Sequence, residues 1–453
     1  MTATTASVAV PGARPAPLGR GYRFELVKLL SQWRVRLLVL ACWVAPAGFV
    51  AVVSRQGSLP TDTVFGRWMH ATGWAGSLVV LAFACGWVLP LLTALVAGDA
   101  FAAEDRLGTW RHLLVTVRSP RRIFAAKALA SLTVIVLLVA GLTASGIAGG
   151  LVSVGNRPLV GLDGHLLAPS DAAVTVLLAW AYVLAPTLAF AAVGLLGSVA
   201  LGRSPMGLLV PALLAFVLQV AQLLPLPVPV RLALPSSGFL AWRGLFTAPA
   251  QHGPLLLGLG VDLAWAVVAT ALAYRLFLRR DFTDLTFDGS GRGAVVAGAL
   301  PLAVLLLVSG AAVATLTPAR GTGVERVDLQ RSLAGAFAHL YRLQTRQLGR
   351  PAVTEAQLRS TASCDKGGSR VLDAGPGNDW RCVVTWHLPG AGAAVGTALY
   401  QLDVAADGRY VADGDGPKEV NGYFSVRTPD GDAPNPLWQL DGTVDLLAST
   451  PKG

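Results

Sequence analysis

Charged side chains are scarce in this chain of 453 residues. Only 14% of its residues are Asp, Glu, Lys or Arg, whereas hydrophobic residues make up 53%. An average soluble domain carries roughly 25% charged residues, so this composition excludes an ordinary soluble protein and indicates a membrane protein. The sequence also lacks the Gly-x-x-x-x-Gly-Lys-Ser/Thr loop that holds nucleotide phosphates. If ATP drives this protein, another chain must bind it.

Histidine and cysteine are few as well, with six and four residues, and no Cys/His spacing resembles a zinc site. The histidines, at positions 70, 112, 165, 252, 339 and 387, are scattered among different loops and the C-terminal region. A glycosyl or acyl transferase needs acids or histidines gathered at one face. We therefore expect no metal and no catalytic residues. The short loop region with Asp163, His165 and Asp171 is the one place where the sequence leaves such a site open.

Several apolar runs are long enough to cross a bilayer, which takes about 20 residues with few charges. We therefore predict an all-α polytopic membrane protein with about seven transmembrane helices, which together form a transmembrane domain over residues 37–316. The runs lie near residues 37–53, 77–97, 124–152, 173–201, 206–230, 254–278 and 294–316.

Basic residues in the short loops set the orientation, because Lys and Arg stay on the cytoplasmic side. Residues 1–21 have no apolar core that would make a cleavable signal peptide, so we expect a disordered cytoplasmic tail there. With the N-terminus inside, the inner segments carry 17 Lys and Arg and the outer short loops carry five. An odd number of helices then places residues 317–453 outside the cytoplasmic membrane.

The net charge of +10 follows from this topology. The first 316 residues contain 22 basic and 11 acidic side chains, whereas residues 317–453 contain 14 and 15. Basic residues at the cytoplasmic surface favour anionic lipid headgroups. We therefore expect the lipid bilayer as a partner and no nucleic acid.

A charged segment precedes the first apolar run. In residues 22–36 and just after, Leu26, Leu30, Trp33 and Leu37 recur at helical spacing among basic residues. This pattern is typical of an amphipathic helix that lies in the headgroup layer. The alternative is that these residues are only the polar flank of the first span.

Residues 317–453 differ in character from the rest. Apolar residues at helical spacing predict an amphipathic helix over 324–347, and strict alternation in the stretch DWRCVVTWHL predicts a strand. The whole region reads as a small extracytoplasmic α+β domain. Oxidation is permitted outside the cytoplasm, so we expect Cys364 and Cys382 to form a disulfide, worth on the order of 3 kcal/mol. Cys42 and Cys85 lie in apolar runs, and the simplest interpretation is that they are small packing residues.

A polar segment, residues 98–123, separates the second and third apolar runs. Leu107, Trp110, Leu114 and Val117 fall on one helix face. Ser119 and Pro120 then suit the start of the next helix. We predict a short amphipathic cytoplasmic helix within 101–117, joined on both sides to transmembrane helices. The alternative is a solvated loop, but such a loop has no need of an apolar face.

The polar segment resembles the E-x-x-x-G-T segment between the second and third spans of the permease subunits of type-2 ABC exporters. The likeness rests on Glu104 to Arg106, Gly108 to Trp110, Leu113 and Leu114, and Ser119 to Arg122 before Lys127. In that family a charged interfacial helix also precedes the first span. The resemblance covers about residues 20–280.

The resemblance implies a function and a set of partners. The chain would be a permease subunit of the cytoplasmic (inner) membrane and no enzyme itself, binding no cofactor, with ATP and magnesium on a separate ABC ATPase subunit. A second permease subunit would complete a homodimer or heterodimer. The expected contacts with the ATPase subunit, in the cytoplasmic coupling segment, are Glu104, Asp105, Arg106, Gly108, Thr109, Trp110 and Arg111.

Two features depart from the plain form of that family. The seventh span and the domain of 317–453 are additions, and this domain resembles small disulfide-bearing extracytoplasmic domains of actinobacterial membrane proteins. The outer loop between the fifth and sixth spans is also short. These departures leave the functional subclass open.

Three polar residues in apolar surroundings are candidates for a transport pathway. Gln219 and Gln222 lie just before a Pro-x-Pro-x-Pro run at 225–229, which cannot continue a helix. Asp262 is the one acid placed inside a span, and an ionisable group at membrane depth is a functional candidate. The alternative for Asp262 is a shallow position where it meets water, Arg231 or Arg243.

Together these features predict an exporter subunit that moves an amphipathic or hydrophobic substrate. One alternative is a membrane-anchored extracytoplasmic sensor or binding protein, although a single span would be enough to anchor it. A membrane-embedded transferase is the other alternative.

Overall fold

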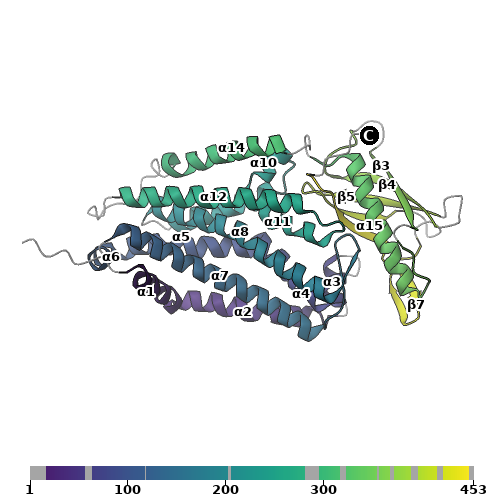
Figure 1. The fold of residues 1–453 in the computed structure, drawn as a ribbon, viewed down its shortest axis with the longest axis horizontal. Coiled ribbons are helices and arrows are strands. Elements are labelled where there is room, and N and C mark those ends of the chain that lie inside the picture. The colour runs from purple at the N-terminus through teal and green to yellow at the C-terminus, as the bar shows by residue number, and fades with distance from the viewer. Residues whose placement is uncertain are drawn as a thin grey trace, which may run out of the picture.

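The computed structural model describes most of the chain. The described residues are 17–56, 64–117, 119–202, 206–280, 295–316, 323–354, 357–367, 372–388, 396–415 and 422–447. Long helices run side by side through the first part of the molecule, and a sheet-containing domain caps one end of them, as Figure 1 shows. At the opposite end lie α1 (Leu18–Ser31) and the short helix α6 (Trp110–Val117).

Within the described residues, six helices are long and apolar enough to cross a membrane. They are α2 (Trp33–Val53), the continuous helix Gly73–Leu107, α7 (Pro120–Ser153), α8 (Pro169–Leu201), α12 (His252–Arg279) and Val296–Leu316. The second of these joins α4 (Gly73–Phe83), the π-helix η1 (Ala84–Val88) and α5 (Leu89–Leu107), and the last joins η4 (Val295–Ala299) to α14 (Leu300–Leu316).

The fifth expected span is shorter than the sequence predicted. Instead of covering 206–230, its helix α9 (Met206–Ala221) has 16 residues, about 24 Å at 1.5 Å per residue. The proline run prevents its continuation, and the chain turns into the short helix α10 (Val228–Leu232). A 3-10 turn η2 (Pro235–Ser237), α11 (Gly238–Ala241) and a second 3-10 turn η3 (Trp242–Phe246) follow before α12.

The N-terminal boundaries also differ from the expectation. The expected interfacial helix of 22–36 is α1, but it begins at Leu18 and ends at Ser31, because the backbone of Gln32 is extended. Trp33 therefore starts the first long helix rather than ending α1. Four residues of the expected 1–21 tail are helical, and residues 1–16 lie outside the described part.

The helices pack through small residues in several places. α8 packs against both α5 and α12, and α7 packs against α2 and α4. At Gly150 of α7, an added Cβ would lie 2.0 Å from the carbonyl oxygen of Gly73 in α4. Backbones approach this closely only where neither residue has a side chain, as is common between membrane helices.

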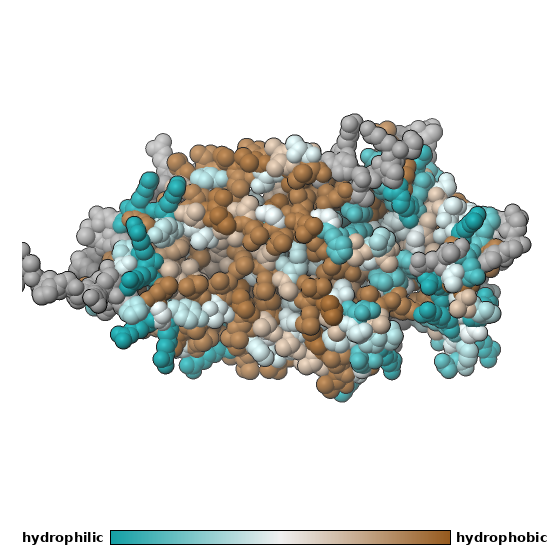
Figure 2. All heavy atoms as spheres, viewed as in Figure 1, coloured by the Kyte–Doolittle hydropathy of each residue, from teal (hydrophilic) through white to brown (hydrophobic). Residues whose placement is uncertain are grey.

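The outside of the helical part is apolar. Large hydrophobic side chains are exposed along several long helices, and Figure 2 shows them as a broad brown band with hydrophilic residues at both ends. A soluble protein rarely exposes so large an apolar surface. The helices and this band have the form of a membrane protein. Exposed members of the band include Leu40, Val44, Leu177, Leu256 and Leu307.

The C-terminal part is an α+β domain, as the sequence predicted. Helix α15 (Arg326–Gln347) packs on an antiparallel sheet of order β3-β4-β5-β6-β9. Phe337 of α15 and Trp380, Tyr400 and Leu440 of the sheet are buried in one core. The strands are β3 (Arg359–Lys366), β4 (Gly377–His387), β5 (Gly396–Val404), β6 (Arg409–Gly414) and β9 (Gln439–Thr443), and a separate hairpin joins β7 (Ser425–Thr428) to β8 (Gly431–Pro434).

The expected disulfide is present. Cys364 in β3 and Cys382 in β4 are directly opposite in the sheet and are bonded. Cys42 and Cys85 are free and buried among apolar residues. The four cysteines therefore divide between packing and cross-linking as the sequence predicted.

Candidate functional site

The polar segment forms a sharp helix–turn–helix–turn at one end of the molecule. α5 ends at Gly108, which has a left-handed backbone (φ 66°) that favours glycine. The expected helix over 101–117 is therefore two helices, since α5 continues to Leu107 and α6 covers only eight residues. Ser119 starts α7 through its backbone carbonyl, which accepts from the N–H groups of Arg122 and Ile123, rather than through its side chain.

A group of paired acidic and basic side chains lies beneath this turn, and we call it the ion cluster: Glu25, Lys28, Glu104 and Lys127. Lys28 is partly exposed and the other three are buried. Lys127 of α7 donates to Glu104 of α5 at 2.7 Å and to Glu25 of α1 at 3.0 Å. Lys28 of α1 also pairs with Glu104, which is 1% exposed. Buried charges persist only when paired in this way. The ion cluster therefore ties α1, α5 and α7 together.

Asp105 makes a second connection, between α5, α6 and α12. It accepts a hydrogen bond from Trp110 Nε1 at 2.6 Å and two from Arg280, one of them at 2.8 Å. The Trp110 ring packs on Phe101 and Phe277, with centroids 6.2 and 5.5 Å apart. Trp110, the first residue of α6, is thus held by its hydrogen bond to the Asp105 carboxylate and by aromatic packing.

The structure divides the seven expected ATPase contacts into two groups. Glu104, Asp105 and Trp110 are buried, and the Thr109 hydroxyl donates inward to Glu104. Arg106 and Gly108 are exposed, and Arg106 reaches back to Asp99 at 3.2 Å. Arg111 lies in α6, but its side chain is outside the described part.

We call the exposed edge of this turn the α6 edge; it consists of Arg106, Leu107, Gly108, His112 and Val115. Two of these side chains, Leu107 and Val115, are apolar. Leu107 is 64% exposed and Val115 is 69% exposed, beside polar neighbours. The sequence predicted Leu107 on the same helix face as Trp110, but the turn at Gly108 separates the two, so that Leu107 is exposed and Trp110 is buried. Exposed apolar residues with a polar rim are typical of a protein contact surface.

The two glutamines that were candidates for a pathway hold the short helix α9 in place. Gln219 Nε2 donates to the carbonyl of Cys85 in η1 at 2.9 Å. Gln222 Nε2 donates to the carbonyl of Arg231 at 3.2 Å and to the Ser236 hydroxyl at 2.9 Å. Both side chains are buried. They bond backbone carbonyls of η1 and α10, so the protein itself provides partners for this irregular backbone.

Asp262 lies deep inside the helical part. It has no exposed surface, and neither carboxyl oxygen has a hydrogen-bond partner within the described ranges. Its Oδ2 lies 2.2 Å from the position that a Cβ on Gly238 would take, so α11 packs directly on it. The structure thus gives no support to the alternative in which Asp262 meets water, Arg231 or Arg243.

The loop region with Asp163 and His165 docks the C-terminal domain. Asp163 bonds the ring of His165, accepts from the Ala248 N–H at 2.7 Å, and lies 3.4 Å from His339 Nδ1 of α15. Burial raises the pKa of Asp163, but hydrogen bonds from His165, His339 and Ala248 outweigh burial and leave it well below its usual value. Asp171 stands apart and exposed at the start of α8. In the described part of the chain, no group of His, Cys, Asp and Glu has the arrangement of a metal site.

Large cavities separate the C-terminal domain from the helix ends. One of about 790 Å³ is bordered by Trp68, Gly161, Leu340 and Trp438, and another of about 370 Å³ by Phe83, Trp87, Arg409 and Asp441 among others. No local pattern indicated either cavity, since each is lined by residues several hundred positions apart.

Comparison with protein-family models finds no match, and no curated protein matches the chain. The fold and the two ends described above define a polytopic membrane protein with a disulfide-bonded α+β domain docked on its helices.

Proposed function

We propose that the chain is the transmembrane permease subunit of an ABC-type exporter, which moves an amphipathic or hydrophobic substrate using ATP hydrolysed by a separate subunit. The observation that carries the proposal is the attachment of α6. Trp110, the first residue of this eight-residue helix, donates to Asp105 of α5 and packs on Phe277 of α12. Asp105 also binds Arg280, and its neighbour Glu104 ties α5 to α1 and α7 through the ion cluster. A displacement of α6 therefore moves four helices together.

In this proposal the α6 end faces the cytoplasm, as the basic residues around it favour. The ATPase subunit contacts the α6 edge, where apolar side chains are exposed. Glu104, Asp105 and Trp110 do not touch the ATPase, but transmit its movement to the long helices. A second permease subunit, identical or related, completes the transporter. The C-terminal domain lies outside the cytoplasmic membrane, where its disulfide is stable.

Purification from native membranes in mild detergent tests this proposal. We expect a stoichiometric partner with a phosphate-binding loop, identified by mass, and ATP hydrolysis by the complex. The double variant Leu107→Asp with Val115→Asp should lose the partner, because charge at the centre of an interface costs about 2 kcal/mol or more. Leu372→Asp, at an 85% exposed leucine of the C-terminal domain, is the matched control. Recovery of the chain alone, without any ATPase, would overturn the proposal.

The alternative of an extracytoplasmic binding protein has one observation in its favour. The cavity of about 790 Å³ between α15, the β7–β8 region and the helix ends is large enough for a small ligand. If the chain purifies without an ATPase, this cavity becomes the functional site to probe. Its residues are not those of the α6 edge, so the two functions are separable by mutation.

A further inference from the structure

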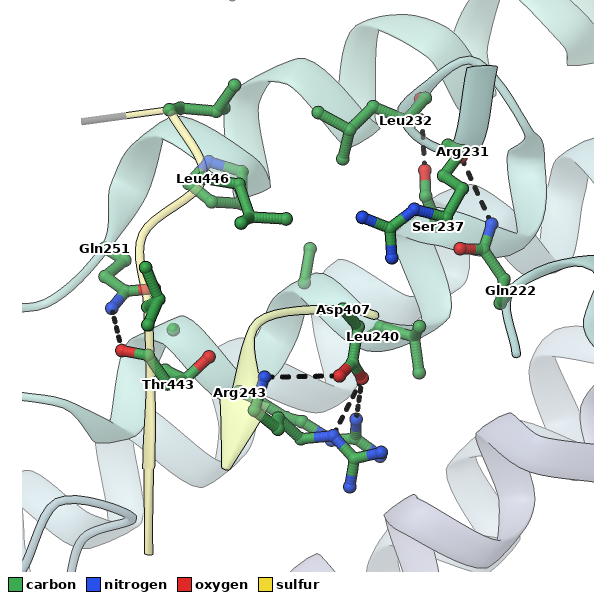
Figure 3. A pocket seen from close by; sticks show the side chains of 16 residues that line it. Gln222, Arg231, Leu232, Ser237, Leu240, Arg243, Gln251, Asp407, Thr443 and Leu446 are labelled. Atoms are coloured by element: carbon green, nitrogen blue, oxygen red, sulfur yellow. Dashed lines mark hydrogen bonds and ion pairs between the residues drawn. The ribbon is translucent and has the colours of Figure 1, made fainter. Parts of the chain in front are cut away.

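Two cavities between the C-terminal domain and the helices share the same arginines. The cavity of about 370 Å³ runs from Val79, Phe83, Gly86 and Trp87 to Arg243 and Arg409. A smaller one, of about 80 Å³, continues from these arginines to Arg231 of α10. Figure 3 shows the smaller cavity, with the guanidinium of Arg231 pointing into it and Arg243 bonded to Asp407.

One end of the larger cavity is apolar and open to the side. Phe83 is 56% exposed and Trp87 is 46% exposed, and both belong to the apolar band of the helical part. Gly86, between them, has no atom within 4 Å of the position a Cβ would take. These residues lie in and beside η1, and π-turns in helices are frequent at functional sites. This end of the cavity is therefore bordered by the surface that lipid chains would cover.

The other end is positively charged. Arg243 donates to Asp407 at 3.1 Å and Arg409 donates to the same carboxylate at 2.7 Å. The two cavities together are lined by three arginines and two aspartates, Asp407 and Asp441, an excess of one positive charge. One carboxylate is thus shared by two guanidinium groups that border an open space.

The lowered pKa values of two of these arginines are consistent with the excess of positive charge. Burial and the neighbouring Arg409 lower the pKa of Arg243 to about 10 in spite of Asp407. Burial also lowers the pKa of Arg231. Both guanidinium groups would therefore gain from a further anion in the cavity.

We infer that the two cavities form one binding site for a membrane lipid with an anionic headgroup. The headgroup contacts Arg243 and Arg409, with Arg231 behind them, and an acyl chain lies along Phe83, Gly86 and Trp87. Guanidinium groups suit phosphate because they donate parallel hydrogen bonds to its oxygens. The lipid enters sideways from the bilayer, and the C-terminal domain supplies half of the headgroup site through Arg409. That this lipid is the exported substrate rests on the proposed function, whereas its binding does not.

The test is a titration of the full chain, purified and delipidated in detergent, with phosphatidylglycerol and separately with phosphatidylcholine, the bound lipid being counted by native mass spectrometry. We expect about tenfold tighter binding of phosphatidylglycerol, a difference of about 1.4 kcal/mol. Both lipids carry the phosphate anion, but phosphatidylcholine also brings a quaternary ammonium whose positive charge would lie beside Arg243 and Arg409. Gly86→Leu fills the chain end without touching the arginines, and Arg409→Gln removes a headgroup contact. Each should weaken phosphatidylglycerol binding about tenfold.

Two controls match these variants. Gly260→Leu adds the same side chain at an exposed helix glycine with equally open surroundings, and Arg381→Gln removes an exposed arginine on β4, away from both cavities. Both should bind as the wild type does. An excess of inorganic phosphate should fail to displace the lipid, because the acyl chain contributes to binding. Equal binding of the two lipids, full displacement by phosphate, or an unchanged Gly86→Leu variant would each overturn the inference.

This result is independent of the ATPase experiment. Selective lipid binding by a chain that purifies alone would keep the site and reject the exporter. Loss of selectivity in a chain that does bind an ATPase would keep the exporter and reject the site.

Discussion

The two ends of the helical bundle differ in how they hold charge. At the α6 end, Glu104 and Asp105 are buried and each is paired with basic side chains from other helices, and the cavities beside the ion cluster are only about 20 Å³. At the C-terminal-domain end, Arg243 and Arg409 share one carboxylate and border two cavities, of about 370 and 80 Å³. The first arrangement is filled and resists deformation. The second leaves both charge and volume for a ligand.

The largest expected effect is at the filled end. Glu104→Ala leaves Lys127 buried without its closest counter-ion, and removing one partner of a buried ion pair costs about 3–5 kcal/mol. The melting temperature of the purified protein should fall sharply. Asp171→Asn, at an exposed acid of α8, is the control and should melt as the wild type does.

The triple variant Glu25→Gln, Glu104→Gln and Lys127→Met distinguishes charge pairing from packing, because Lys127 pairs with both buried acids and none of them is left as an unpaired charge. Replacing both partners of a buried pair costs far less than removing one, so this variant should recover much of the lost stability. If Glu104→Ala alone melts within a degree of the wild type, the ion cluster does not hold the α6 end together.

The disulfide should have the next largest effect, confined to the other end. Cys364→Ala with Cys382→Ala opens a loop with a sequence separation of 18, worth about 3 kcal/mol. Proteolysis of the C-terminal domain should become faster, while the helical part keeps its resistance. Cleavage that spreads equally into the long helices would show that the two ends do not unfold separately.

Asp163→Asn tests the docking of the C-terminal domain. It weakens the contacts with His165, His339 and Ala248, at a cost of about 1–3 kcal/mol. The folded pKa of Asp163 lies below its usual value, so its contribution is complete above the unfolded pKa of about 3.9 and is lost as the pH falls through the lower folded pKa.

The pH dependence provides the measurement. The difference in unfolding temperature between wild type and Asp163→Asn should shrink as the pH falls below about 4, where the Asp163 carboxylate begins to lose its contribution. Asp171→Asn again provides the control. A difference that does not shrink below about pH 4 would contradict a depressed carboxyl pKa and would reject this account of the docking.

The smallest expected effect is at Asp262, whose carboxyl group is hydrogen-bonded neither to the ion cluster nor to Arg243 and Arg409 within the described residues. Asp262→Asn keeps the shape of a side chain that has no hydrogen-bond partner within the described residues and removes the cost of a buried charge. The melting temperature should stay the same or rise by a few degrees. A clear fall would reveal a partner that stabilises the carboxylate.

The sequence predicted the long helices, the C-terminal α+β domain and its disulfide because each of these depends on residues that are close together in the chain. Apolar runs, helical spacing around Trp110, strand alternation around Trp380 and the two C-terminal cysteines each involve neighbouring residues. Even the short α9 has a local signal, since the prolines after Gln222 end its helix. The expectation of a full span there gave too much weight to hydrophobicity and too little to proline.

The details of the candidate sites could not be predicted in the same way. The partners of Glu104 and Asp105 include Lys28 and Arg280, which are 76 and 175 residues away along the chain. No spacing rule indicates that an acid in a polar segment turns inward to such partners. The lipid site joins Phe83 to Arg409, so it exists only once the C-terminal domain is docked.

The close approach of Gly73 and Gly150 fixes one point of α7 against α4. This helix has 34 residues, a rod of about 51 Å at 1.5 Å per residue, and the glycine contact lies near the end away from α6. A tilt of ~5° about that point carries the far end of the rod by ~4 Å. In the proposed exporter, α7 would pivot at this glycine contact, and a displacement at its α6 end would become a small rotation of the helix near Gly150.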